Sequence, residues 1–204
     1  MAEQIYREET GSGIVLGPFD QDGFYNIENS KDVRISRKEH LKSVECVVIR
    51  NDELLLIEVK KTAPKELSAE RKKERLAEMI KAGNLKEYEE LIKSVKMVPS
   101  YVSDICEKFI LSLCLVLSIA EGRMQSEDMP PELREKIRNV CGQKPIFVLV
   151  ITQSKADWVC HIQDALNLSL RKFEKTNHIK VIVLTAEQAK SKGLVHTFTP
   201  MPVS

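Results

Sequence analysis

The chain contains four short runs of almost uninterrupted aliphatic residues, at 44–49, 54–59, 146–151 and 181–184. Each run has the length of a β-strand. A strand without polar alternation has both faces covered, as in the centre of a sheet that contains parallel strands. Segments in which apolar residues recur at helical spacing separate the second, third and fourth runs. The sequence therefore predicts an α/β fold in which helices flank a mixed central sheet.

The segment between the second and third runs is predicted to be helical. Ser68 can cap the start of a first helix that Gly83 ends, and a shorter helix is expected from 85 to about 95. Pro99 then precedes a long helix at 101–121, whose apolar residues cover more than one side. We interpret residues 66–97 as a helical insertion after the second strand.

The rest of the chain fits the same fold class. A short helix is expected at 130–142 and a longer one at 156–175, on either side of the third run. Residues 1–42 are rich in glycine and predict loops with one or two short strands and a short helix. A length of 204 residues suits one hydrophobic core, so we expect residues 1–204 to form a single domain.

Composition limits the class of protein. Lysine and arginine almost cancel aspartate and glutamate, giving a formal net charge of +1, which argues against tight and autonomous nucleic-acid binding. The five cysteines form no CxxC pair and predict free thiols in a reducing compartment. The longest apolar run, 109–120, is shorter than the roughly 20 residues of a membrane span. We therefore expect a soluble, cytoplasmic protein without a secretory signal.

The first two runs predict a β-hairpin closed by Asn51-Asp52. A turn of even length pairs Arg50 with Glu53 and, counting outward, places Glu45 opposite Glu58. Alternation then puts Glu45 and Glu58 on one face together with Lys60. The opposite face is expected to be apolar throughout: Val44, Cys46, Val48, Leu55, Ile57 and Val59.

The predicted register has a chemical consequence. Opposed side chains have Cβ atoms about 5 Å apart, and two like charges at that distance destabilise a hairpin unless they are compensated. A divalent cation with a preference for oxygen ligands, Mg²⁺ or Mn²⁺, would compensate Glu45 and Glu58. Lys60 would then orient a water or offset charge on a phosphate. The alternative is that both acids mark frayed strand ends and that Lys60 forms an ordinary ion pair with one of them.

This arrangement resembles the core of the PD-(D/E)XK, or restriction-endonuclease-like, nuclease superfamily. The resemblance covers about 43–61 and rests on Glu45, its spacing to Glu58, and the segment 54–60, which looks like that family's E-x-K strand. It implies an αβββαβ core, Mg²⁺-dependent phosphodiester hydrolysis, Glu45 and Glu58 as metal ligands, and Lys60 as the catalytic lysine. The family usually has aspartate at the position of Glu45.

Accessory residues are also expected from the resemblance. The family often adds an acidic residue from an N-terminal element, for which Glu28 is the first candidate and Glu39 the second. A basic residue from the long helix faces the site in some relatives, and Lys108 is suitably placed. The competing interpretation of Lys108 is a surface ion pair with Asp104, four residues earlier on the helix.

Three functions are compatible with the sequence. The first is a metal-dependent nuclease acting on DNA, held by a partner subunit or as a homodimer, in a restriction or phage-defence system; this last step is analogy. The second is a catalytically inactive nuclease-like subunit that acts in assembly or positions nucleic acid. The third is an unrelated α/β domain with an accidental E-x-K.

Overall fold

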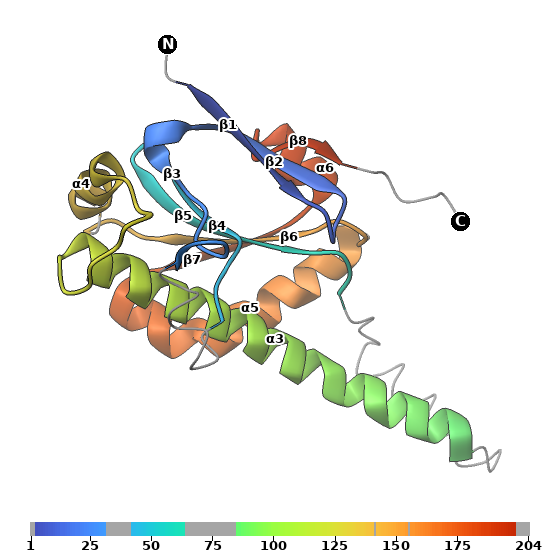
Figure 1. Ribbon diagram of the computed structural model, residues 1–204. Helices are drawn as coiled ribbons and strands as arrows, with labels where there is room; N and C mark the ends of the chain where they lie inside the picture. The colour runs from blue at the N-terminus through green and yellow to red at the C-terminus, as the bar shows by residue number, and fades with distance from the viewer. Residues whose placement is uncertain (1–2, 32–41, 64–84, 141, 155, 199–204) are drawn as a thin grey trace.

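The computed structural model describes residues 3–31, 42–63, 85–140, 142–154 and 156–198 (Figure 1). Within these ranges the chain is an α/β protein whose mixed central sheet is flanked by helices, as the aliphatic runs predicted. None of the described helices combines the length and the apolar character that a membrane span requires.

The central sheet has five strands in the order β3-β4-β5-β6-β7 within the described ranges. The strands are β3 (Phe24–Tyr25), β4 (Cys46–Arg50), β5 (Glu53–Lys60), β6 (Ile146–Ile151) and β7 (Lys180–Thr185). Neighbours are antiparallel from β3 to β5 and parallel from β5 to β7. The four aliphatic runs are therefore the four adjacent strands β4 to β7, which explains why they carry almost no polar residues.

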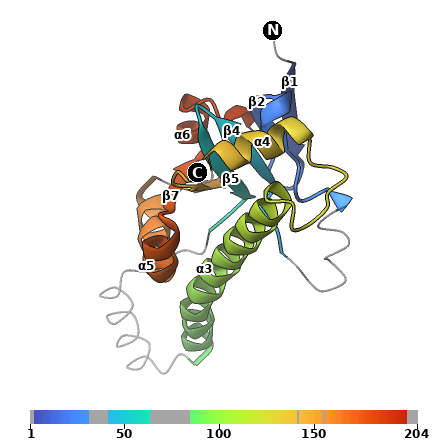
Figure 2. The same cartoon turned by 90° about the vertical axis from the view of Figure 1, so that its left-hand side faces the viewer.

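Helices cover one face of this sheet. They are α3 (Leu85–Ala120) and α5 (Ala156–Asn177), which contact each other below the strands, and α4 (Pro131–Val140), which contacts β4 and β5 (Figures 1 and 2). Between helices and sheet lies the helix-side core, which includes Val47, Leu56, Phe109, Phe147, Leu149 and Leu166. The positions predicted for the helices after Pro130 agree with α4 and α5 to within a few residues.

A second sheet covers the opposite face. It consists of β1 (Gln4–Glu9), β2 (Ile14–Asp20) and β8 (Val195–Phe198), all antiparallel, with the short helix α6 (Ala186–Ser191) beside it (Figure 1). Between the two sheets lies the sheet-side core, which includes Leu16, Phe19, Cys46, Ile57, Val148 and Val195. The 3-10 turn η1 (Gln21–Gly23) leads from β2 to β3.

The N-terminal region is more regular than its composition predicted. We expected loops with one or two short strands in 1–42, whereas residues 4–20 form a hairpin of two full strands. Strand β1 is hard to recognise because most of its residues are polar and it lies at the edge of its sheet, where only one side is paired. Its polar character is explained by the site described below.

The predicted break between two helices near Pro99 is absent from α3. We predicted one helix ending near 95 and another beginning after Pro99, but the backbone is helical without a break from Leu85 to Ala120. Proline lacks the amide hydrogen of the helix ladder and costs about 3 kcal/mol in a helix interior. The apolar side chains that follow Pro99, among them Ile105 and Phe109, are fully buried and stabilise the helix from its second half. Of the proposed insertion at 66–97, residues 66–84 lie outside the described ranges and the rest is the start of α3.

Phe109 of α3 stacks on Phe147 of β6, with ring centroids 4.6 Å apart and planes inclined by 3°. Because both rings are completely buried, Phe109→Ala should lower the free energy of unfolding by about 3–5 kcal/mol. Urea denaturation followed by circular dichroism measures this change. The control is Leu168→Ala on α5, where the side chain is 71% exposed. That substitution should cost less than about 0.5 kcal/mol, and equal losses would contradict the assigned packing.

Candidate active site

The hairpin that carries the predicted site forms as expected. Asn51 and Asp52 both have positive φ, 51° and 59°, which is the geometry of a two-residue type I′ turn. Arg50 pairs with Glu53, and the same register continues to Cys46 opposite Ile57. The turn therefore sets the register that the sequence predicted.

Counted from the turn, regular pairing ends at Cys46, so it does not reach Glu45. The amide of Glu45 donates to the carbonyl of Ile57 at 3.0 Å, so Glu45 and Glu58 are not a pair of the ladder. Val44, expected on the face of Cys46 and Val48, belongs instead to the helix-side core, and its amide donates to the hydroxyl of Ser112 on α3. That expectation was wrong because alternation stops where the ladder stops.

Glu45 lies in a cluster of acids around a buried arginine. The Nη2 atom of Arg7, on β1, lies 2.7 Å from a carboxylate oxygen of Glu45, 2.7 Å from one of Glu28 and 3.5 Å from one of Glu9. Each acid offers an oxygen within 4.8 Å of the other two. Arg7 is only 6% exposed, and its second terminal nitrogen donates to the side-chain oxygen of Asn26. We call these four residues, Arg7, Glu9, Glu28 and Glu45, the arginine cluster.

Glu58 lies in a second group, with two lysines. Its side chain is completely buried, and one oxygen binds the ammonium of Lys108 at 2.7 Å and that of Lys60 at 2.9 Å. Lys60 is 28% exposed and Lys108 is 15% exposed, so both reach toward the surface. The other oxygen of Glu58 is buried and has no hydrogen-bond partner in the described part of the chain. We call these three residues the lysine cluster.

The two clusters influence each other electrostatically. Burial raises the pKa of Glu45 to about 9, helped by its hydrogen bond with Glu28 and by the charge of Glu58. Burial also opposes ionisation of Glu28, but the hydrogen bond with Glu45 and the charges of Arg7 and Lys108 outweigh it and lower the pKa of Glu28. We infer that Glu45 and Glu28 share one proton, which Glu45 holds.

The pKa of Glu58 is also raised, and burial is the cause. The positive charges of Lys108 and Lys60 act in the opposite direction without cancelling it. Tyr101 of α3 lies within the field of Glu58, and burial, followed by the charges of Glu58 and Asp104, raises the pKa of its phenol. A carboxyl group with a raised pKa in a partly open charged site is typical of functional positions.

The structure thus places all five expected site residues in two neighbouring groups. Glu28 and Glu45 belong to the arginine cluster, and Glu58, Lys60 and Lys108 form the lysine cluster. Lys60 makes the ion pair that the alternative interpretation anticipated. The surface pair expected for Lys108 is replaced, because Asp104 binds Lys42 at 2.8 Å and leaves Lys108 to Glu58. Glu39 lies outside the described residues.

Sequence reasoning missed Arg7, Glu9 and Tyr101. Arg7 and Glu9 are two residues apart on β1, so their side chains leave the strand on the same face. That spacing was a usable signal, but only if residues 4–9 had been recognised as a strand. Tyr101 is the second residue after Pro99, and only the tertiary fold brings it near Glu58.

The donor set is compatible with a divalent cation. All candidate ligands are carboxylate oxygens, which Mg²⁺ and Mn²⁺ prefer. The buried oxygen of Glu58 that has no partner within the described ranges supplies an acceptor, and Glu9, Glu28 and Glu45 are close enough to offer three further ligand atoms. Arg7 provides positive charge at these three acids, so a cation bound by Glu28 and Glu45 together would compete with its guanidinium.

Comparison of the chain with protein-family models, with curated proteins and with solved structures gave no match. Interpretation of the site therefore depends on its geometry.

The raised pKa of Glu45 predicts a pH dependence of stability. Between its ordinary value of 4.5 and about 9, the folded chain holds a proton on Glu45 that the unfolded chain releases. The free energy of unfolding should therefore fall as the pH rises through this range. Glu45→Gln should make the fall smaller, because glutamine does not titrate. Urea titrations at several values from pH 5 to pH 8.5, with EDTA present, measure both slopes, and identical slopes would disprove the assignment.

The lysine cluster predicts that removal of Glu58 destabilises the folded chain more than removal of an exposed acid. Glu58→Ala leaves the ammonium of Lys108 in a largely buried position without its counter-charge. Breaking a buried pair in this way should cost about 3 kcal/mol, measured by urea denaturation at pH 7. The matched control is Glu107→Ala, whose ion pair with Lys42 is about half exposed and should contribute much less to stability. A similar small effect at both positions would argue that Glu58 is solvated.

Proposed function

We propose that this chain is a metal-dependent nuclease of the PD-(D/E)XK kind, which hydrolyses phosphodiester bonds in DNA. The observation that carries the proposal is the buried Glu58, with one carboxylate oxygen bound to Lys60 and Lys108 and the other without a partner among the described residues. A carboxylate that has one oxygen available and two ammonium groups on the other suits a site that receives a cation and an anionic phosphate together.

The order of elements supports the proposal. Strands β3, β4 and β5, then α3 and β6, follow the βββαβ part of the expected αβββαβ core, with the E-x-K on the third strand of that series. The helix that opens that core has no counterpart before β3, since residues 4–23 form β1, β2 and η1. Here the short hairpin β1-β2 supplies the site with Arg7 and Glu9 instead.

In the proposed site, the acids bind the metal and the lysines supply positive charge. Glu45 and Glu58 would hold the metal, with Glu28 as the third carboxylate. Bound Mg²⁺ or Mn²⁺ supplies an activated water and a positive charge for the scissile phosphate. Lys60 and Lys108 balance the buried charge of Glu58 and, because both are partly exposed, place positive charge where a phosphate can approach.

The biological setting is part of the proposal. A net charge of +1 supplies little attraction for a polyanion, so the chain is expected to cut DNA when a partner subunit or a second copy holds the substrate. A restriction or phage-defence system is such a setting. Cys46, Cys106 and Cys114 are free thiols, which agrees with a reducing compartment such as the cytoplasm.

Cleavage of plasmid DNA by the purified chain with Mg²⁺ or Mn²⁺ tests the proposal. Glu58→Ala and Lys60→Ala should each reduce the rate by about 100-fold or more, because the first removes a proposed metal ligand and the second removes positive charge beside the reacting phosphate. Lys61→Ala, at the exposed neighbouring position, should leave the rate unchanged. Cleavage that survives both Glu58→Ala and Lys60→Ala would remove the assigned site.

A catalytically inactive nuclease-like subunit is the second candidate. It is favoured by the internal compensation of the acids, because Arg7 already binds three carboxylates and two lysines already bind Glu58. Calorimetric titration with Mn²⁺ separates the two functions. Binding that is lost in Glu58→Ala supports the enzyme, whereas no binding by the wild type, with a stable complex recovered by pull-down, supports the subunit.

A further inference from the structure

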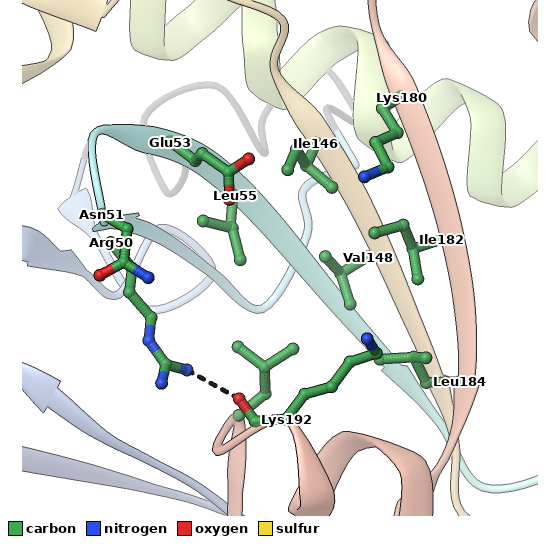
Figure 3. A pocket seen from close by; sticks show the side chains of 11 residues that line it. Arg50, Asn51, Glu53, Leu55, Ile146, Val148, Lys180, Ile182, Leu184 and Lys192 are labelled. Atoms are coloured by element: carbon green, nitrogen blue, oxygen red, sulfur yellow. Dashed lines mark hydrogen bonds between the residues drawn. The ribbon is translucent and has the colours of Figure 1, made fainter.

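A hollow of about 290 Å³ lies on the other side of the central sheet from α3 and α5, at the end where the hairpin turns (Figure 3). It lies on the opposite face of the sheet from Glu58, because its lining residues Leu55 and Val148 belong to the sheet-side core, whereas Glu58 binds Lys108 of α3. The volume is close to the lower limit of about 300 Å³ for small-molecule pockets. This hollow is distinct from the arginine and lysine clusters.

The floor of the hollow is apolar. It is formed by neighbouring side chains of β5, β6 and β7 and closed at one side by the segment after α6; these side chains are Leu55, Ile146, Val148, Ile182, Leu184 and Leu194. Most of them belong to the sheet-side core, which the second sheet covers elsewhere. The hollow is therefore a place where that core opens to solvent.

The rim of the hollow is basic. Arg50, Lys180 and Lys192 line it against a single acid, Glu53, in a chain whose total net charge is only +1. Figure 3 shows the ammonium ends of Lys180 and Lys192 directed over the apolar floor from β7 and from the end of α6. Neither ammonium is engaged in an ion pair with any residue in the described ranges. Two lysines over an aliphatic surface favour a ligand that is both apolar and negatively charged.

One wall is fixed in place. Arg50 donates through Nη1 to the carbonyls of Lys192 and Gly193, both at 3.0 Å. Gly193 has a φ of 66°, and a Cβ there would lie 3.1 Å from Nη2 of Arg50. Glycine thus allows both the turn and the close approach of the guanidinium. The hairpin turn and the segment after α6 are held together by this contact, so the hollow exists before any ligand binds.

We propose that this hollow binds a small organic anion with an aliphatic or aromatic body, such as a medium-chain carboxylate. The body covers the floor formed by Leu55, Val148 and Ile182, and the acid group interacts with Lys180 and Lys192. The site does not depend on the proposed nuclease function, and it requires no metal.

Fluorescence titration of the full chain with anilinonaphthalene sulfonate tests this site, because the probe combines an anionic group with aromatic rings. Lys180→Glu and Lys192→Glu should each weaken binding about tenfold, the effect of losing one charge-assisted contact. The matched control is Arg171→Glu, an equal charge reversal at an exposed position on α5, which should leave the affinity unchanged.

Two further measurements exclude a general hydrophobic effect. Decanoate should displace the probe at about tenfold lower concentration than decanol, and Lys192→Glu should abolish this preference. Ile182→Trp should fill the hollow and remove binding while thermal melting shows that the chain remains folded. Equal probe affinity in the wild type, Lys180→Glu and Lys192→Glu would overturn the proposal, as would equal displacement by the acid and the alcohol.

Discussion

A strand that is buried on both faces cannot carry an uncompensated charge, and β5 is such a strand. Its residues from Leu54 to Val59 are all buried, yet Glu58 is one of them. Removing a carboxylate from water costs several kcal/mol unless partners are supplied. The structure supplies two partners, Lys60 from the end of the same strand and Lys108 from α3, outside the hairpin. The packing of α3 against the sheet thus brings Lys108 to the buried carboxylate of Glu58.

The same constraint explains the N-terminal hairpin. Glu45 and Glu28 lie close together beside the sheet, and like charges at that distance need a cation or a proton. Arg7 supplies the cation and the raised pKa of Glu45 supplies the proton. Strand β1 lies at the edge of its sheet, yet it contributes to the site, because it positions the guanidinium of Arg7 beside the side chains of Glu9, Glu28 and Glu45.

The sequence predicted the features that depend on local rules. The two-residue turn at Asn51-Asp52 fixed the hairpin register, and uninterrupted aliphatic residues identified the buried strands. Features decided by tertiary contacts were not predictable in this way. Strand β1 was not located within 1–42 because its polar residues contribute to a site formed with distant segments. Pro99 predicted a helix boundary, although the packing of α3 outweighs its local cost. The end of the ladder at Cys46, which changes the surroundings of Glu45, likewise follows from the contact of Val44 with Ser112.

The partners in the two clusters are widely separated along the chain. Arg7 and Glu45 are 38 residues apart, and Glu58 and Lys108 are 50 apart. Contacts between such remote positions form slowly, since a long loop must close before they contribute any stability. During synthesis on the ribosome, the acids of the hairpin emerge well before Lys108. Until α3 has docked, a nascent chain therefore has its carboxylates in water with ordinary acidity, and the charge arrangement described here belongs only to the fully assembled protein.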